Sequence, residues 1–471
     1  MQIKKDESGK RIAVPLNQVE QVNKLAGLKG DLDLHLDYHI PKIIITALDT
    51  ATELAIAAGL EALKQAKIPL VPEDLNDLNP PNWDLPKPYQ DSTGIIFASS
   101  FPVIDSFAKE LKSYFEYHAK MILMDQFSKS GIISEEILNQ ELSKIDKFEF
   151  NRKLLFELLV LGNSQLAQLI KAKGPNTTIN AACASTTQAI CIAEDWIKLG
   201  RCERVIIVGA DNTTSENLLS WIGTGFLILG AASTEAKVEN AALPFDARRN
   251  GMILGMGAVG LIVESEASVR ERGIQPMCQI IGTHMANSAY HGTALDPKHT
   301  ADELEKFITR LGKLGKINRD ELKKQLAYMS HETFTFANGG AAKSEINALR
   351  HTFGDISEVI IANTKGFTGH PMGVGIEDAM AAYALKFGKL PPMANHKDVD
   401  PELGELKFPT GEEKFNYILR FSAGFGSQLV YILMKKHSIA ITNNQFDEWV
   451  KKNIGEKIKI TEDGILMTVP K

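Results

Sequence analysis

The chain has 471 residues, of which 44% are hydrophobic and 23% charged, and its formal net charge is -6. This composition is that of a globular protein with one large core or two packed halves. Its charges are spread without a long basic run, so nucleic-acid binding is not expected. No apolar stretch is long enough for a membrane span, and the N-terminal MQIKKDESGKRI lacks the apolar region of a signal peptide.

The first hundred residues predict an extension, one helix and one strand. Residues 1–40 are polar and mixed. In residues 47–68, apolar side chains recur every three or four positions, which predicts a helix. The prolines of residues 71–90 favour an extended surface loop, and TGIIFASS at residues 93–100 has the pattern of a short buried strand.

The rest of the chain alternates between predicted strands and helices. Residues 101–150 predict a long, charged helical insert with many aromatic side chains, and residues 154–170 predict a buried helix pair. The alternation that follows favours an α/β layered fold, with two strand-rich halves at 41–268 and 269–436 that pack together. Residues 437–471 differ in character and predict a short helix followed by a hairpin.

Four cysteines, at positions 183, 191, 202 and 278, are too few for a disulfide framework in a chain of this length. They have no metal-ligand spacing, so no metal site is predicted. Reduced thiols in a cytoplasmic protein are the simplest interpretation.

Cys183 lies in a segment with the features of a nucleophile site. The sequence TTINAACASTTQAICIAEDWIKL runs from a β-branched stretch through small residues into an amphipathic helix, so the thiol falls in the turn that opens the helix. Unpaired backbone N–H groups and the helix dipole favour a thiolate there, and the same N–H groups can bind an oxyanion. The local pattern fits a small buried cysteine equally well. Cys191 and Cys202 have the pattern of ordinary helix and strand-edge residues.

Two of the 11 histidines stand out by their surroundings. His331 follows the strand-like LAYMS and begins HETFT, which carries two threonine hydroxyls. His370 lies in NTKGFTGHPMGVGIEDA, where glycines shape a tight loop before a helix. One histidine in such a loop is most often structural. Two of them at strand ends, together with Cys183, predict a site of one cysteine and two histidines.

The same segments resemble the motifs of the β-ketoacyl synthases. GPNTTINAACASTTQAI is similar to their nucleophile block, HETFT to their His-Gly-Thr-x-Thr loop, and NTKGFTGHPMG to their Lys-x-x-x-Gly-His loop. PFDARRNGMILGMGAVGLIVE, NSAYHGTALDP and RFSAGFGSQLVYIL resemble three further family segments in the family's order. The resemblance covers residues 40–436. It implies a thiolase-like fold, in which two related α-β-α halves form a five-layered α-β-α-β-α core.

The resemblance implies an elongating synthase of the Cys-His-His type. Cys183 would accept an acyl group from a thioester, and a malonyl thioester would lose carbon dioxide to give an enolate. His331 and His370 would stabilise the developing charge, and attack on the acyl group would release a β-ketoacyl product. Lys365 would complete the catalytic set, with Glu377 as the supporting acid.

Further roles follow from the resemblance. The oxyanion hole would consist of the backbone N–H groups of Cys183 and Phe425. Phe425 would act as a gate, and its two glycine neighbours would allow it to move. The phosphopantetheine arm and the acyl group would contact a set of loop residues: Thr333, Thr335, Gly424, Phe425 and Gly426.

The sequence departs from the family pattern at several positions around these motifs. The segment between His370 and Glu377 is about two residues shorter than usual. Five further positions carry residues that the family does not usually have: Met256, Glu332, Phe334, Ser427 and Gln428. These departures leave room for an acyltransferase on the same scaffold. A non-catalytic subunit that sets chain length, or one module of a larger synthase, would also be compatible with the sequence.

Partners are also implied by the resemblance. No cofactor is expected, since the substrates arrive on the phosphopantetheine arm of an acyl carrier protein or of coenzyme A. A homodimer is the usual state of the family. The insert at residues 101–150 would then line an acyl tunnel or cover the edge of the dimer, and the sequence leaves both possibilities open.

Overall fold

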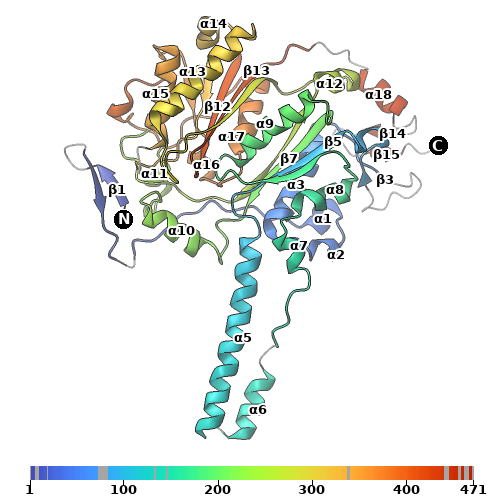
Figure 1. Cartoon of the computed structure of the whole chain (residues 1–471), viewed down its shortest axis with the longest axis vertical. Coiled ribbons are helices and arrows are strands. Elements are labelled where there is room, and N and C mark those ends of the chain that lie inside the picture. Colours follow the sequence, from blue (N-terminus) through green and yellow to red (C-terminus); the bar gives the residue numbers. More distant parts are fainter. Residues whose placement is uncertain are drawn as a thin grey trace.

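The computed structural model describes residues 2–5, 10–18, 20–72, 83–131, 134–144, 147–336, 340–439, 445–453, 458–460 and 466–468. Two sheets form the centre of the molecule (Figure 1). The first has the order β6 (Asn176–Ile179), β5 (Thr93–Ala98), β7 (Arg204–Asp211), β8 (Gly257–Glu264). The second has the order β11 (Ile360–Ala362), β10 (Leu326–Met329), β12 (Tyr417–Gly424), β13 (Gln428–Lys435), β9 (Gln279–Asn287).

Each sheet combines parallel and antiparallel pairs. In the first, β5 runs parallel to both β6 and β7, whereas β8 is antiparallel to β7. In the second, β10, β11 and β12 are parallel, and β13 is antiparallel to β12 and β9. The parallel strands in each sheet end on one side, and the loops that follow them can therefore meet there.

Helices cover both sheets and fill the space between them. The middle layer contains α9 (Ser185–Lys198) and α17 (Ile376–Phe387). The outer layers contain α3 (Thr50–Gln65) and α8 (Gly162–Ile170) on the first sheet, and α13 (Pro297–Lys313) and α15 (Ala341–Phe353) on the second. The predicted five-layered α-β-α-β-α core is therefore confirmed.

Alternation along the strands explains why both faces of each sheet are buried. In β7, Val205 and Ile207 pack into the middle layer, while Ile206 and Val208 pack against the outer helices. Successive side chains of a strand point to opposite faces, so this continuous apolar run belongs to a sheet covered on both sides. The strand predicted at residues 93–100 is confirmed as β5, which is fully buried.

The predicted first helix is confirmed as α3. Asp49 caps it by accepting hydrogen bonds from the N–H groups of Ala51 and Thr52, and one face of the helix packs on the first sheet. The preceding extension also reaches the core, because Leu34 and Ile40 are buried in the same cluster as α3.

The prediction of a buried helix pair at residues 154–170 is half wrong. The second helix, α8, is buried against the first sheet. The first helix, α7 (Leu154–Leu158), buries Leu154 but leaves Leu155 61% and Phe156 52% exposed. Its apolar side chains therefore form part of the surface in this structure.

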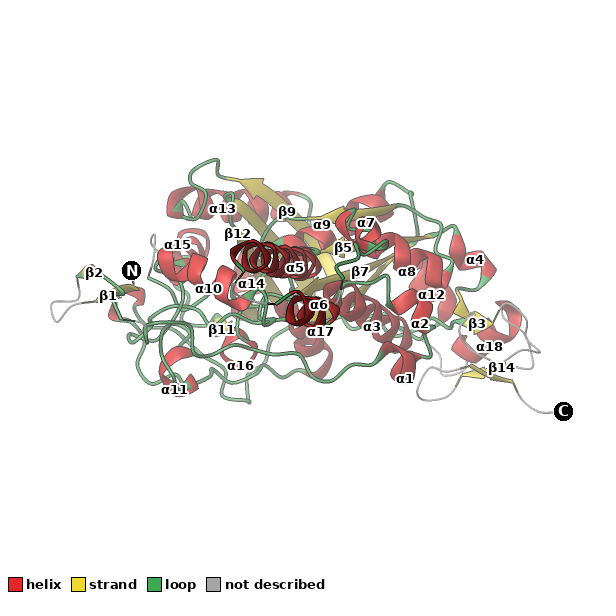
Figure 2. Cartoon of the chain, turned by 90° about the horizontal axis from the view of Figure 1, so that it is seen from below, coloured by secondary structure: helices red, strands yellow, loops and turns green. Residues whose placement is uncertain are grey.

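The insert forms an arm that projects from the body. It consists of α5 (Ile104–Ser130) and α6 (Glu135–Ser143). Figure 1 shows α5 pointing away from the sheets, and Figure 2 shows both helices nearly end-on. Across its described length, α5 has no fully buried side chain.

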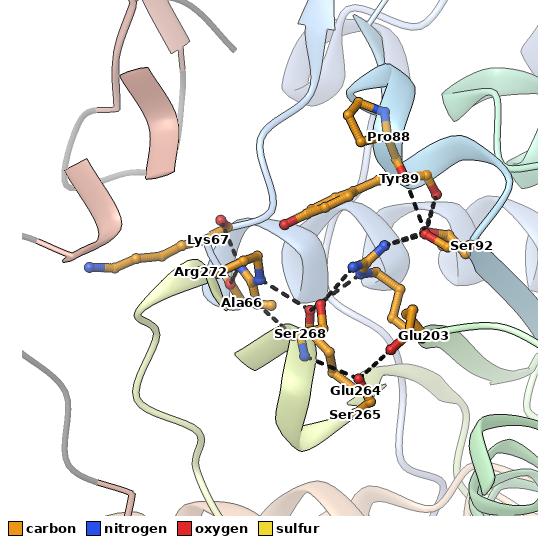
Figure 3. Close-up of polar contacts among 12 residues, drawn as sticks. Ala66, Lys67, Pro88, Tyr89, Ser92, Glu203, Glu264, Ser265, Ser268 and Arg272 are labelled. Atoms are coloured by element: carbon orange, nitrogen blue, oxygen red, sulfur yellow. Dashed lines mark hydrogen bonds and ion pairs between the residues drawn. The ribbon is translucent and has the colours of Figure 1, made fainter. Parts of the chain in front are cut away.

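A buried ionic cluster fixes α12 (Glu266–Arg272) to the first half of the molecule (Figure 3). The Glu264 carboxylate lies 3.3 Å from Nε of Arg204 and 2.6 Å from NH2 of Arg272. Arg272 also donates to the carbonyl oxygen of Ala66, 2.9 Å away, at the end of α3. Because Glu264 has two buried partners, the cluster joins β7, β8, α3 and α12 into one unit. The predicted boundary at residue 268 lies within α12.

Shorter elements complete the described part of the chain: β1 (Gln2–Lys5), β2 (Arg11–Val14), α1 (Leu34–Tyr38), α2 (Lys42–Ile45), β3 (Val71–Pro72), β4 (Trp83–Asp84), α4 (Lys87–Gln90), α10 (Leu219–Ile228), α11 (Val238–Ala241), α14 (Arg319–Lys324), α16 (Lys365–Thr368), η2 (Pro401–Leu403), α18 (Gln445–Asn453), β14 (Ile458–Ile460) and β15 (Leu466–Thr468). β14 and β15 pair antiparallel, so the predicted helix and hairpin of the tail are confirmed. Half of the predicted proline-rich loop, residues 73–82, lies outside the described residues. None of the helices in the described ranges has the length and apolar character needed to cross a bilayer.

Candidate active site

Cys183 lies in a tight turn between β6 and α9. The preceding residue, Ala182, has a φ of 48°, in the left-handed region that non-glycine residues seldom adopt. The hydroxyl of Ser185 stabilises the turn by accepting from the N–H of Ala181 and donating to the carbonyl of Ala182. From β12, the Ser422 hydroxyl donates to the carbonyl of Cys183 at 3.2 Å. The turn thus holds Cys183 at the start of a helix, as the sequence predicts.

The two predicted histidines lie side by side on loops from the second half. His331 follows β10, and its backbone N–H donates to the Glu345 carboxylate of α15 at 3.0 Å. The backbone of His370 pairs with the segment around Leu254 from the first half. The ring centroids of the two histidines are 5.7 Å apart and nearly perpendicular, and both rings are buried. Cys183 lies far from both histidines along the chain, so the three residues form one site only if they share a cavity.

One cavity does connect them. Seven of the predicted site residues line it: Cys183, His331, Thr333, Thr335, His370, Gly424 and Phe425. Apolar side chains form much of the remaining wall, including Phe226 and Leu229 from the region of α10, and Met252. Gly426 is not among the lining residues, and its N–H donates to the carbonyl of Gly292 at 2.8 Å. The thiol and both imidazoles therefore share one cavity with two threonine hydroxyls.

Lys365 and Glu377 lie behind the cavity as a buried ion pair. Both side chains are almost fully buried and in direct contact. Arg420 of β12 lies 3.4 Å from Glu377 and 2.9 Å from Asp378. Burial raises the pKa of Glu377, but Lys365 and Arg420 outweigh this effect and lower it to about 2. Asp378 in turn accepts from the hydroxyl of Thr187 in α9. Arg420 also donates to the carbonyl of Ser330, next to His331, so the network links the helix that follows Cys183 to the loops of both histidines.

Burial and nearby cations keep both histidines neutral. Burial is the main reason that the pKa of His331 lies well below its usual value, and Lys365 lowers it further. The same two causes lower the pKa of His370 to about 3. The Nδ1 atoms of both rings are buried without a hydrogen-bond partner in the part of the chain that the structure describes. A neutral imidazole has one N–H that can donate a hydrogen bond, so each ring can stabilise a negative charge that develops on an oxygen in the cavity.

The thiol of Cys183 differs from the expected thiolate. Burial raises its pKa to about 12, although Lys365 acts in the opposite direction. Desolvation of the charged form thus exceeds the stabilisation expected at the start of a helix. The neutral thiol is therefore the resting form.

Glu332, where the family pattern has glycine, is fully buried and stabilises the histidine loop. Its carboxylate accepts from the N–H of Phe334 at 3.2 Å and from that of Ala342, in the first turn of α15, at 2.8 Å. Arg249 lies 3.3 Å from the same carboxylate. Burial and the charge of Glu332 raise the pKa of Glu345, the acceptor for the His331 N–H, to about 7. This departure therefore replaces a flexible residue with one that fixes the loop.

Sequence patterns missed the two residues that complete the ionic network. Arg420 is a lone charge in the apolar strand YILRFSAG, and a buried arginine in such a strand needs an acidic partner. Asp378 follows Glu377 in the first turn of α17. Together, these two signals could have predicted the pairing.

Gly424 has no room for a side chain, which yields a prediction. A Cβ atom at this position would lie 2.2 Å from the carbonyl oxygen of Ala181 and 3.3 Å from the nitrogen of Ala184. We expect Gly424→Ala to displace the nucleophile turn, slow acylation of the thiol by about 10²-fold and lower stability by about 1–3 kcal/mol. Protein mass and urea unfolding measure the two effects. Gly225→Ala is the control, because its Cβ would meet nothing within 4 Å, and an unchanged Gly424→Ala protein would contradict the geometry.

The chain matches proteins of one kind in sequence. Residues 161–268 match the family model described as "Beta-ketoacyl synthase, N-terminal domain". A 3-oxoacyl-[acyl-carrier-protein] synthase 2 from Staphylococcus aureus is 25% identical over 416 residues, which cover 87% of each chain. The oxytetracycline polyketide β-ketoacyl synthase 1 of Streptomyces rimosus is 26% identical over 272 residues, or 56% of this chain and 60% of that one.

Solved structures agree on the fold. A β-ketoacyl synthase from Burkholderia phymatum has a TM-score of 0.67 at 17% identity and covers 89% of this chain and 93% of its own. The ishigamide ketosynthase/chain length factor has a TM-score of 0.62 at 19% identity, with 87% of each chain covered. A type II polyketide ketosynthase in complex with its acyl-carrier protein has the same TM-score of 0.62.

The layers and the ketosynthases that share them identify a thiolase-like fold. Residues 161–268 match the N-terminal domain of the β-ketoacyl synthases, and the chain as a whole is similar to β-ketoacyl synthases of fatty-acid and polyketide type.

Proposed function

We propose that the chain is an elongating β-ketoacyl synthase that carries out decarboxylative Claisen condensation on substrates held by an acyl carrier protein. The observation that supports this most is the single cavity lined by Cys183, His331 and His370. One thiol and two neutral imidazoles are the groups needed to accept an acyl chain and then stabilise an enolate.

Acylation comes first. The Cys183 thiol attacks the thioester carbon and gives up its proton, because the resting thiol is protonated. The proton passes to the sulfur of the departing pantetheine thiol. The backbone N–H groups of Cys183 and Phe425 stabilise the tetrahedral oxyanion, and the carrier leaves as a free thiol.

Condensation follows with a malonyl thioester in the same cavity. The carbon–carboxylate bond breaks, carbon dioxide leaves, and the electron pair forms an enolate whose oxygen accepts hydrogen bonds from His331 and His370. The enolate carbon attacks the acyl carbon and the bond to Cys183 breaks. The β-ketoacyl chain is now two carbons longer and remains on the incoming carrier, and the departing Cys183 thiolate takes up a proton from water to become a thiol again.

The residues around Cys183 and the two histidines position the substrate arm and set the charge of the imidazoles. Thr333 and Thr335 line the path to the thiol and donate hydrogen bonds to the pantetheine arm. Burial, helped by the charge of Lys365, keeps both imidazoles uncharged, and Lys365 is paired with Glu377 and does not line the cavity. Phe425, in contact with Phe226 at a centroid distance of 5.7 Å, gates the wall beside the thiol. An acyl carrier protein is the partner that this chemistry requires, and the substrates supply the only prosthetic group.

A homodimer is the second part of the proposal. Within the described strands, β6 pairs only with β5, so it is an edge strand whose outer backbone groups remain available. This strand leads directly into the turn of Cys183. Antiparallel pairing of β6 with its counterpart in a second copy, about a two-fold axis, would satisfy these groups and support the turn.

Replacement of His370 tests the condensation step. With His370→Ala, we expect acylation of Cys183 to continue and condensation to fall by about 10²–10³-fold, since the enolate loses a hydrogen-bond donor. Protein mass after incubation with an acyl carrier thioester measures the first step, and β-ketoacyl product after addition of malonyl carrier measures the second. His351→Ala, an exposed histidine of α15, is the control. Full condensation activity in His370→Ala would refute this role.

A further inference from the structure

The arm of α5 and α6 carries an apolar stripe that no described part of the chain covers. Ile104, Phe107, Leu111, Phe115 and Ile122 follow one another at spacings of three, four, four and seven, which places them on one face of the helix. Their side chains are between 38% and 63% exposed. Such spacing is typical of a helix that packs against another protein surface.

The arm packs internally through a different face. Glu110, Tyr117 and Met124, spaced by seven, are partly buried, and they lie well over a quarter turn around the helix from the stripe. The Glu110 carboxylate accepts from the N–H of Asn151 in the returning segment at 2.8 Å. The contacts that hold the arm together therefore leave its apolar stripe free.

The base of the arm is fixed to the body. The Asp105 carboxylate accepts hydrogen bonds of 2.8 Å from Asn212, 2.8 Å from Ser215 and 3.1 Å from Asn217. These three residues precede α10, which contributes to the cavity wall. Because its base is fixed, the arm presents the stripe in one direction. Less ordering is then needed when a specific partner binds.

The stripe is continuous with other apolar surface. Close to half of the large apolar side chains that are exposed within the described residues lie between residues 104 and 159. They include Leu155 and Phe156 of α7, which contacts the base of α5. The helix that follows, α8, contacts the edge strand β6. Apolar patches of this extent on one side of a protein mark an interaction surface.

We propose that the arm is a clasp for a second copy of this chain, with the stripe of α5 packed against that copy. The proposal rests on the proposed homodimer, because pairing at β6 would bring the second copy next to α7 and the base of the arm. The charges of α5 disfavour an anionic lipid surface, since four lysines are balanced by four acidic residues. The stripe itself contains no charge and therefore offers nothing to an acidic carrier protein.

Two aspartates on the stripe test the clasp. In Phe115→Asp/Ile122→Asp, each copy of the dimer would bury two charges in an apolar contact, so we expect the dimer dissociation constant to rise by about 100-fold or more. Ser113→Asp/Lys120→Asp is the matched control, with the same spacing on the opposite, exposed face. Sedimentation equilibrium over a concentration series measures the constant, and circular dichroism checks that helix content is unchanged.

Hydrogen exchange of the wild type gives a second measurement that does not depend on the variants. Amides of residues 111–123 should exchange more slowly in the dimer than in diluted monomer. A monomeric wild type, a wild type that floats with phospholipid vesicles, or equal dissociation constants for the stripe and control variants would overturn the clasp. Acylation of Cys183 is measured in parallel. A dimer weakened only by the stripe variant would support the clasp even if no acylation occurred, and that absence would instead contradict the proposed function.

Discussion

Cys183→Ala is expected to reduce acylation of the protein by at least about 10³-fold, because the substitution removes the only atom that forms the acyl bond. Mass spectrometry of the intact protein after incubation with an acyl carrier thioester would show the acyl increment in the wild type and not in the variant. The cavity should remain intact, since alanine fits among the small residues of the turn.

Cys278→Ala is the matched control for this result. The pKa of Cys278 is also raised to about 12 by burial, so the two thiols share a low intrinsic reactivity in the resting protein. Cys278 packs against the apolar middle layer, away from the residues that line the cavity. An acyl increment that persisted in Cys183→Ala and vanished in Cys278→Ala would show that Cys278, and not Cys183, is the nucleophile.

Glu377→Ala should give the largest loss of stability. The substitution leaves Lys365 buried without its contacting carboxylate and removes one partner of Arg420. Breaking a buried pair in this way costs about 3–5 kcal/mol. Urea unfolding measures the loss. The control is Glu266→Ala, which removes a 2.6 Å pair with Arg270 whose side chains are both about half exposed, and it should cost less than about 1 kcal/mol.

The Glu377 carboxylate should also make the free energy of unfolding depend on pH. The pKa of Glu377 is about 2 in the folded protein against an ordinary value of 4.5. A lowered folded-state pKa contributes stability above the ordinary value, and this contribution is lost as the pH falls from 4.5 towards about 2. The wild type should therefore lose more stability than Glu377→Ala across this range. Equal acid sensitivity of the two proteins, or a small cost of the substitution at neutral pH, would contradict the ion pair.

The predictable part of the site consists of local signals. Cys183 and His331 each follow the end of a strand, and His370 follows the short helix α16 in a glycine-rich loop, so the placement of all three follows from the chain nearby. Alternation of strands and helices likewise predicted the layers. Both predictions rest on patterns that span only a few neighbouring residues. The apolar strands keep their pattern because both faces of each sheet are buried.

The remaining features depend on contacts between distant segments. Arg420 and Asp378 meet across 42 residues, and neither has a local partner in the sequence. Glu332 appeared as a departure of unknown effect, because its partner Arg249 comes from another loop 83 residues away. The apolar side chains of α7 and α5 have the pattern of buried helices, yet they lie on the surface of this chain. An apolar helix face in a sequence predicts that the face is buried, but it does not identify the molecule against which the face packs.

The most direct test of the proposed reaction is to measure carbon dioxide and β-ketoacyl product together. The wild-type protein, loaded with an acyl group, is given malonyl carrier labelled at the free carboxylate. We expect one labelled carbon dioxide for each β-ketoacyl product, and neither from Cys183→Ala. Acylation of the wild type with no release of carbon dioxide would contradict the proposed condensation and indicate an acyltransferase on the same scaffold.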